Sequence, residues 1–202
     1  MIESRGQQMA RAQFDREEII DKSIGLFWEN GYSASSMQKV VKTTGLKPGS
    51  IYLAFGNKEG LFREALESYA RKTIEAIHHL MATAPSIGAG ICMFLEQKVV
   101  ESTQKTYCSC FLVKTRLELA AEGGELHELA SSKLDKIEEV LEGYIAKEYG
   151  SEVSKQRAIS LMMHIFGVRV YGYQQGSADR MRLGLREGLP WLPWETLNCI
   201  SL

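Results

Sequence analysis

With 202 residues, of which 45% are hydrophobic and 24% are charged, the chain has the composition of a folded globular protein of one or two domains. This composition excludes a fibrous or disordered protein, and the longest strongly apolar stretch, Leu161 to Phe166, is far shorter than the roughly 20 residues of a transmembrane helix. The four cysteines are too few and too unevenly placed for a disulfide framework, so we expect reduced thiols in a cytoplasmic protein with no membrane partner.

Charge is distributed unevenly along the chain, although the net charge is only -1. Residues 1–58 hold eight Lys or Arg against six Asp or Glu, whereas residues 59–202 hold sixteen against nineteen. A local basic patch can attract nucleic acid whatever the total charge of the protein. The window from 30 to 58 contains no acidic residue and four lysines, which are Lys39, Lys42, Lys47 and Lys58.

The first element expected in chain order is a flexible N-terminal arm, residues 1–14, because this polar stretch lacks the apolar core of a signal peptide. A helix follows, with Asp15 as its N-cap and Glu18 as the acid of a capping box. Apolar residues recur at helical period from Ile19 onward, until Asn30-Gly31 supplies a stop.

Two shorter helices are predicted next. Ser35 with Gln38 repeats the capping-box pattern at the start of the second helix, and a glycine turn at Gly45 ends it. Lys47 is expected to be extended because a proline follows it, and the third helix is predicted from Pro48 to Ala54. Two helices joined by a glycine turn, with lysines around the second, meet the requirements for entering a DNA major groove. The charge pattern alone favours a solvated, slightly basic helical hairpin.

The apolar, glycine and aromatic positions of this region form one long pattern in several parts. Its members are Ile19-Ile20, Leu26-Phe27, Gly31-Tyr32, Ser35-Ser36-Met37, Gly45-Leu46, Gly49-Ser50-Ile51-Tyr52, Phe55, Asn57-Lys58-Glu59 and Leu61-Phe62. With these residues the chain resembles the TetR (tetracycline repressor)/AcrR family of bacterial transcriptional regulators over about residues 15 to 65. It departs from the family pattern at Lys47-Pro48, where relatives have Ser-Lys, and at Leu53-Ala54, which either contact a thymine methyl group or simply pack.

The resemblance implies an all-α protein with a helix-turn-helix DNA-binding domain at 15–60, whose recognition helix spans about 48–54. A larger effector-binding and dimerisation domain is implied at 61–202. The family binds a pseudo-palindromic double-stranded operator as a homodimer, usually as a repressor, and releases it when a small-molecule effector binds; the effector is unknown here. The DNA-contacting residues that the resemblance implies are Ser36, Gln38, Lys47, Gly49, Ser50, Tyr52 and Lys58.

From Asn57 onward the sequence predicts helices only. Segment 158–173 is apolar nearly all the way round, so it needs cover on more than one side. A second copy, as the resemblance implies, would provide this cover, and the alternative is a central core helix of a monomer. The helices run to about Thr83 and then over 88–101, 109–121, 125–149, 153–174 and 177–188, about nine in the whole chain. The candidate dimer-interface residues are Ile159, Val170, Tyr171 and Leu183.

Aromatic, methionine and cysteine side chains of the larger domain are candidates for lining an effector pocket, although at helical spacing they equally fit an ordinary core. The two nearby cysteines resemble a stretch with which some relatives sense electrophiles or oxidants. A thiol at a helix N-terminus ionises more readily and a second thiol can resolve a sulfenic acid, so a redox trigger is one hypothesis and two inert, buried thiols are the other. The candidates are Phe94, Cys108, Cys110, Phe111, Met162, Met163 and Phe166.

An enzyme is not expected, because no phosphate loop, zinc-protease motif or serine-hydrolase motif stands out in the sequence. No cofactor and no metal are expected. Two interpretations from other classes stay open. One is a helical thiol enzyme that uses Cys108 or Cys110 with His127, and the other is a module whose third helix binds a protein.

Overall fold

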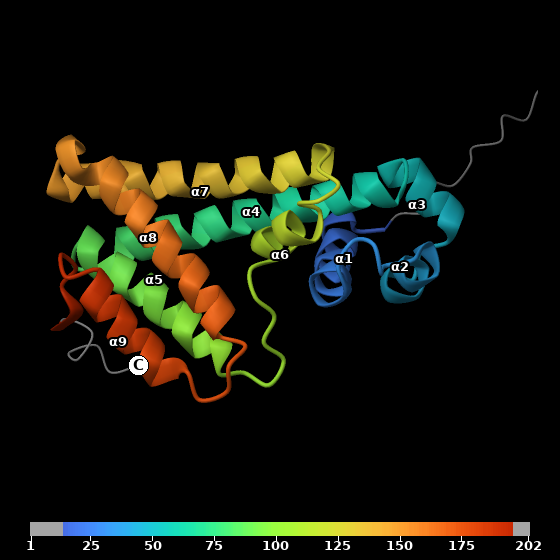
Figure 1. Cartoon of the computed structure of the whole chain (residues 1–202). Coiled ribbons are helices and arrows are strands. Elements are labelled where there is room, and N and C mark those ends of the chain that lie inside the picture. The colour runs from blue at the N-terminus through green and yellow to red at the C-terminus, as the bar shows by residue number, and fades with distance from the viewer. Residues whose placement is uncertain (1–13, 196–202) are drawn as a thin grey trace, which may run out of the picture.

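The computed structural model describes residues 14–195, and these residues form nine α-helices and no β-strand (Figure 1). The predicted all-α fold is therefore confirmed. The arm predicted at 1–14 lies, apart from Phe14, outside the described residues, as does Cys199. The helices are α1 (Arg16–Asn30), α2 (Met37–Thr44), α3 (Pro48–Phe55), α4 (Lys58–Thr83), α5 (Ile87–Ser102), α6 (Phe111–Glu118), α7 (Glu125–Tyr149), α8 (Ser151–Tyr171) and α9 (Ala178–Gly188).

Helix α4 links the two ends of the molecule (Figure 1). Helices α1, α2 and α3 gather at its N-terminal end, and α7 packs along its length. Helix α8 packs on α5 and α7, α9 packs on α5 and α8, and the short α6 contacts both α4 and α7. Helix α4 runs through the boundary expected between residues 60 and 61 without interruption, so the two predicted domains share one rigid element. Between residues 14 and 195 no helix has the length and hydropathy needed to cross a membrane.

The start of α1 agrees with its predicted cap. The Asp15 carboxylate accepts hydrogen bonds from the backbone N–H groups of Glu17 (2.9 Å) and Glu18 (3.3 Å). Such a cap satisfies two of the N–H groups that a helix leaves unpaired at its N-terminus. The predicted capping box is incomplete, because the Glu18 carboxylate forms an ion pair with Lys22 at 2.7 Å.

The cap predicted for α2 is wrong by one residue. Ser36 is the N-cap, and its hydroxyl accepts a hydrogen bond from the Lys39 N–H at 3.3 Å. Ser35 is buried, and its hydroxyl donates to the Gly31 carbonyl at 2.6 Å. Its hydroxyl is thus occupied by the end of α1, so the next serine caps α2. Lys47 is extended (ψ 149) ahead of Pro48, as predicted.

Two helices of the larger part differ in length from their predictions. The helix expected at 109–121 spans only Phe111–Glu118, because Cys110 is its N-cap and the chain leaves helical geometry at Leu119. The helix expected at 153–174 begins two residues earlier, directly after Gly150 (φ 90), and ends at Tyr171. These differences arise at chain reversals, where packing against other helices decides how far a helix extends.

Candidate nucleic-acid interface and effector region

Helix α3 presents a free outer face to solvent. Its inner side buries Ile51 and Phe55 in the core, while Tyr52 is 52% exposed and Leu53 is 87% exposed. Gly49 is exposed and has open space beside its Cα. Leu53 therefore does not pack within its own chain, so of the two roles that the sequence left open only the contact with a thymine methyl group stays a prediction.

Lysines and polar groups flank this face. Lys42 and Lys47 are exposed, and neither forms an ion pair with any acidic side chain in the described part of the chain. Lys39 behaves differently, since its ammonium donates to the Asn30 side-chain oxygen (3.1 Å) and to the Ala34 carbonyl (3.0 Å). The remaining predicted contacts on this side are exposed Ser36 and Gln38 and half-exposed Ser50.

Lys58 has an internal partner at the start of α4. Its ammonium donates to the Tyr32 carbonyl at 2.9 Å and lies 4.0 Å from the centre of the Tyr32 ring. A cation at a helix N-terminus opposes the helix dipole, and the carbonyl and the ring offset this cost. Lys58 thus ties α4 to the turn before α2, and a phosphate contact for it remains a prediction.

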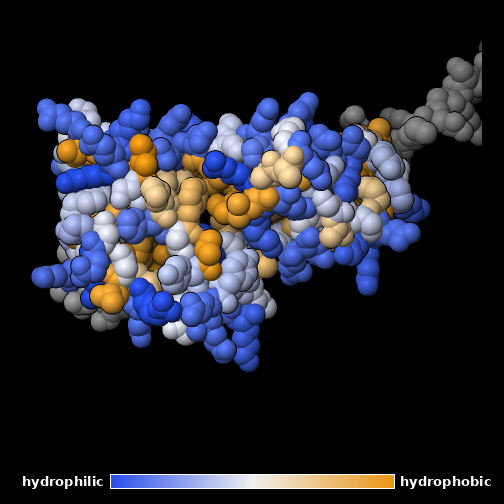
Figure 2. Space-filling view, in the orientation of Figure 1, coloured by the Kyte–Doolittle hydropathy of each residue, from blue (hydrophilic) through white to orange (hydrophobic). Residues whose placement is uncertain are grey.

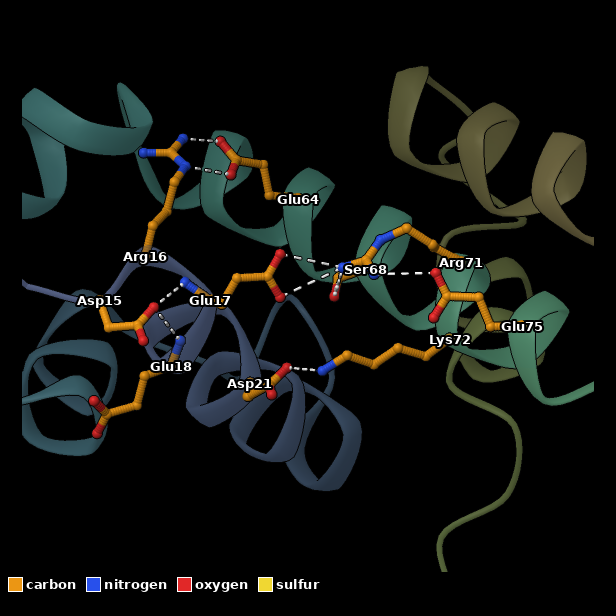
Figure 3. Close-up of polar contacts among 10 residues, drawn as sticks. All are labelled: Asp15, Arg16, Glu17, Glu18, Asp21, Glu64, Ser68, Arg71, Lys72 and Glu75. Atoms are coloured by element: carbon orange, nitrogen blue, oxygen red, sulfur yellow. Dashed lines mark hydrogen bonds and ion pairs between the residues drawn. The ribbon is translucent and has the colours of Figure 1, made fainter. Parts of the chain in front are cut away.

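A network of polar contacts fixes the N-terminal helices on α4 (Figure 3). Arg16 also reaches α3, because its guanidinium donates to the Ala54 carbonyl at 3.0 Å and lies 4.4 Å from the centre of the Phe55 ring. Exposed ion pairs contribute little stability each, but several of them define one orientation. The pairs between α1 and α4 are Arg16–Glu64, Glu17–Arg71 and Asp21–Lys72.

Helix α6 and the segment before it hold the C-terminal end of α1. The Trp28 indole N–H donates to the Ser109 carbonyl, and the Lys114 ammonium donates to the Trp28 carbonyl. The Glu118 carboxylate accepts from the N–H groups of Tyr32 (3.1 Å) and Ser33 (2.9 Å). Four hydrogen bonds thus join α6 and the segment before it to the end of α1 and the turn that follows.

Aromatic rings connect helices α1, α4 and α6 inside the protein. Phe62 of α4 is fully buried, and its ring centre lies 4.8 Å from Phe27, 4.9 Å from Tyr32 and 5.4 Å from Phe111. Edge-to-face pairs at these distances add to the stabilisation from burial. The cluster makes α1, α4 and α6 one packing unit.

The predicted effector residues do not all face the interior. Phe94, Cys110, Phe111 and Met162 are buried, and Phe166 and Cys108 are half-buried. Met163 is 68% exposed, so it does not face the interior and instead lines the surface groove between α8 and α9. The reason is helical geometry, because consecutive residues of a helix point about 100° apart and only Met162 can face the core.

A polar cluster beside these residues was missed in the sequence. Arg169 of α8 is buried, and its Nη1 lies 2.9 Å from the Glu101 carboxylate of α5. Lys98 pairs with the same carboxylate at 2.5 Å, and its ammonium lies 5.1 Å from the Phe94 ring centre. Burial lowers the pKa of Lys98. The available signal was an arginine within the otherwise apolar segment 158–173.

The N-terminal helices carry a sequence pattern that is found in known proteins. The family model described as bacterial regulatory proteins, tetR family, matches residues 19–65, which hold most of α1, all of α2 and α3 and the start of α4. The N-terminal helices of the chain are thus similar to the DNA-binding part of TetR-family regulators. It is similar to the transcriptional repressor ComR of Escherichia coli (strain K12), with 29% identity over 148 residues, 66% of this chain and 65% of that protein. The match thus spans slightly less than two thirds of that relative's length.

Solved structures of TetR-family regulators share the fold. A cysteine-substituted variant of the regulator CifR, complexed with a 26-base-pair operator DNA, superposes with a TM-score of 0.73 at 23% identity, covering 90% of this chain and 98% of that one. FadR of Bacillus subtilis, in complex with stearoyl-CoA, has a TM-score of 0.66 at 19% identity, covering 86% and 99%.

The cysteines of the described residues lie in different environments. Cys110 is the N-cap of α6 and is buried, without a side-chain hydrogen bond to the helix. Cys108 is half-buried and lines a cleft of about 270 Å³ together with Trp28 of α1. Cys92 is buried in α5, and burial raises the pKa of its thiol to about 12. Of the three cysteines that the structure describes, Cys108 is thus the thiol with the best access to a solute.

The candidate dimer residues lie on the outer face of α8 and α9. Ile159, Val170, Tyr171 and Leu183 are all exposed, at 41%, 62%, 47% and 63% respectively. Exposed Met163 lies four residues after Ile159 and so extends the same stripe. A groove of about 430 Å³ runs between the two helices. Figure 2 shows hydrophobic surface gathered where α8 crosses the molecule, while the edge along α7 is largely hydrophilic.

Proposed function

We propose that this chain is a transcriptional regulator that binds operator DNA through α2 and α3 and is controlled by a small molecule bound in the larger domain. The single observation that carries the proposal is the outer face of α3. It combines a glycine, a tyrosine and an exposed leucine with neighbouring lysines that have no acidic partner between residues 14 and 195. The DNA-binding domain is assigned to 15–60 and the effector and dimerisation domain to 61–202.

The chemistry of α3 suits a major groove. Gly49 permits close approach of the backbone to a phosphate, and Tyr52 offers a hydroxyl and a flat ring at the surface. Leu53 offers an apolar contact of the kind that distinguishes a thymine methyl group. Lys42 and Lys47 supply the positive charge that phosphates attract.

A homodimer would use the α8 and α9 face. A row of apolar side chains as exposed as these is unusual for a monomer, and pairing with a second copy would bury it. In such a dimer, two DNA-binding domains about 34 to 36 Å apart would bind successive major grooves of a pseudo-palindrome. Repression follows if the operator overlaps a promoter.

Release from DNA would pass through α6. Effector binding that displaces α6 would also displace the end of α1, through the contacts of Trp28 and Glu118. This would change the position of the DNA-binding helices relative to α4. An effector shifts this equilibrium only by its difference in affinity for the two conformations.

The test of the DNA interface is a selection of bound sequences from a random duplex library, with the full chain. Tyr52→Ala and Ser50→Ala are expected to change the preferred sequence, whereas Lys58→Ala is expected to weaken binding to all sequences. Tyr144→Ala, a matched change on distant α7, should leave the preferred site unchanged. Binding that is insensitive to salt and to all three changes would contradict the proposal.

The dimer is tested by Val170→Glu combined with Leu183→Glu. Because a buried carboxylate without a partner is costly, these changes are expected to yield monomers at micromolar concentration and to weaken operator binding. Leu117→Glu, an equally exposed leucine on α6, serves as the control. Light scattering coupled to size-exclusion chromatography gives the mass, and a dimer that survives the double change locates the interface elsewhere.

A second candidate is a redox-sensing regulator, favoured by the position of Cys108 in the cleft beside α1. Hydrogen peroxide would oxidise the Cys108 thiol to a sulfenic acid with release of water. Condensation with the Cys110 thiol would then form a disulfide and a second water. We expect Cys108→Ser to abolish peroxide-triggered release from DNA and Cys92→Ser to leave it intact. If Cys108→Ser, Cys110→Ser and the double variant all respond like the parent, the redox candidate is eliminated.

A further inference from the structure

Two buried cations of the effector region share a single carboxylate. Glu101 pairs with Arg169 and with Lys98, whose side chains are only 7% and 13% exposed, while its own side chain is 41% exposed. The Nε of Arg169 is buried and has no hydrogen-bond partner. An unpaired buried donor on a charged group is costly, so a site of this kind is incomplete without a further acceptor.

The neighbouring phenols do not supply the missing negative charge. Burial raises the pKa of Tyr69 and of Tyr107, so both are neutral in neutral solution. The Tyr107 hydroxyl is also engaged, because it donates to the Arg169 carbonyl at 3.1 Å. Among residues 14–195, Glu101 is thus the carboxylate that balances both cations.

A cleft leads from the surface to this carboxylate. Its volume is about 270 Å³, and it lies between α1 and the segment that follows α5. Glu101 and Tyr107, which both hydrogen-bond to Arg169, form part of its wall, and Trp28, Cys108 and the exposed Glu29 form another part. The half-exposed Glu101 side chain therefore separates the cleft from the buried guanidinium.

We propose that this cleft is the entrance to an anion subsite, in which the carboxylate of a small organic acid displaces Glu101 and pairs with Arg169. An incoming carboxylate gains a charge-assisted pair with a guanidinium that has a free N–H, while Glu101 moves to solvent. The cleft is smaller than a typical drug-sized pocket, so the acid is small, with its apolar part against Trp28.

This inference rests on the proposed function, because it names the chemical class of the effector. An acid in the cleft lies against α1, whose Trp28 is held by Ser109 and Lys114. Occupation of the cleft therefore acts on the contacts that position the DNA-binding helices.

The test measures binding of three acids and their neutral matches to the full chain without DNA, by calorimetry. The pairs are benzoate with benzamide, phenylacetate with phenylacetamide, and hexanoate with hexanamide. At least one carboxylate is expected to bind roughly tenfold or more tightly than its amide, since a hydrogen bond to a charged group is the stronger one. Arg169→Met should remove this difference, and Arg157→Met, on the same helix but outside the cluster, should keep it.

Glu101→Gln is the more decisive variant. If the Arg169–Glu101 pair only stabilises the fold, this change should not tighten the binding of an acid. Removing the competing carboxylate is expected to tighten binding of the acid by about tenfold. Because Glu101 is half-exposed, Glu101→Gln is expected to fold, so it tests the proposal even if Arg169→Met does not fold. The proposal is overturned if no acid binds better than its amide, or if Glu101→Gln binds no more tightly. Operator binding without any acid is measured in parallel, so a failure of the proposed DNA-binding function is recognised separately.

Discussion

Replacing Lys42 and Lys47 together by glutamine is expected to weaken operator binding by roughly a hundredfold to a thousandfold at physiological salt. Both ammonium groups are exposed beside α3, and neither has an acidic partner in the described residues, so both are free to neutralise phosphates. A dimer would lose four such contacts. Each phosphate contact contributes about 0.9 to the slope of log affinity against log salt, so this slope should fall by about 3 to 4.

The measurement is a fluorescence-anisotropy titration of an operator duplex at several salt concentrations. The matched control replaces Lys147 and Lys155, which are exposed on α7 and α8, and so removes the same net charge far from α3. If both double variants weaken binding equally, only the total charge of the protein matters and α3 loses its special role. If neither changes the slope, phosphates are not bound by these lysines.

Phe62→Ala is expected to lower the free energy of unfolding by about 3 to 5 kcal/mol. Phe62 is fully buried at the centre of the aromatic cluster, and its removal leaves a cavity between α1, α4 and α6. The surrounding helices cannot close this cavity easily, because the α1–α4 ion pairs and the α6–α1 hydrogen bonds hold them in place. The loss exceeds that from any single exposed ion pair, which contributes about 0 to 1 kcal/mol.

Urea unfolding at one fixed protein concentration measures this change, since the stability of the proposed dimer would depend on concentration. Leu117→Ala serves as the control, because Leu117 is 68% exposed on α6 and its truncation should change stability by about 0.5 kcal/mol or less. A loss below about 1 kcal/mol for Phe62→Ala would mean that the aromatic cluster does not carry the contact between the two domains.

The N-terminal helices are the region where sequence and structure agree best. Asp15 caps α1, and Pro48 starts α3 after an extended Lys47, both as predicted. Each of these signals acts within about four residues of the chain, through a side chain that bonds to a nearby backbone N–H or through a proline ring that restricts its neighbour. The error at Ser35 arose where a contact to the preceding helix took the hydroxyl that the local pattern had assigned to the cap.

The effector region was predicted less completely, since its features depend on residues far apart in the chain. Periodicity marks both Met162 and Met163 as apolar, but only the packing of α8 on α5 and α7 decides which of them is buried. Arg169 is conspicuous in an apolar segment, yet nothing near it in sequence names Glu101, 68 residues away, as its partner. The same holds for Glu118, whose contact with Tyr32 joins α6 to α1 across 86 residues.

Local sequence was therefore sufficient for the fold class, the positions of nearly all the helices and the outward face of α3, because caps, turns and apolar periodicity are short-range effects. Three features could be identified only in the tertiary structure. They are the incomplete charge balance around Arg169, the cleft beside Cys108 and the link from α6 to α1. They arise when helices from distant parts of the chain pack together, because the energetic cost of a buried charge depends on the groups that surround it.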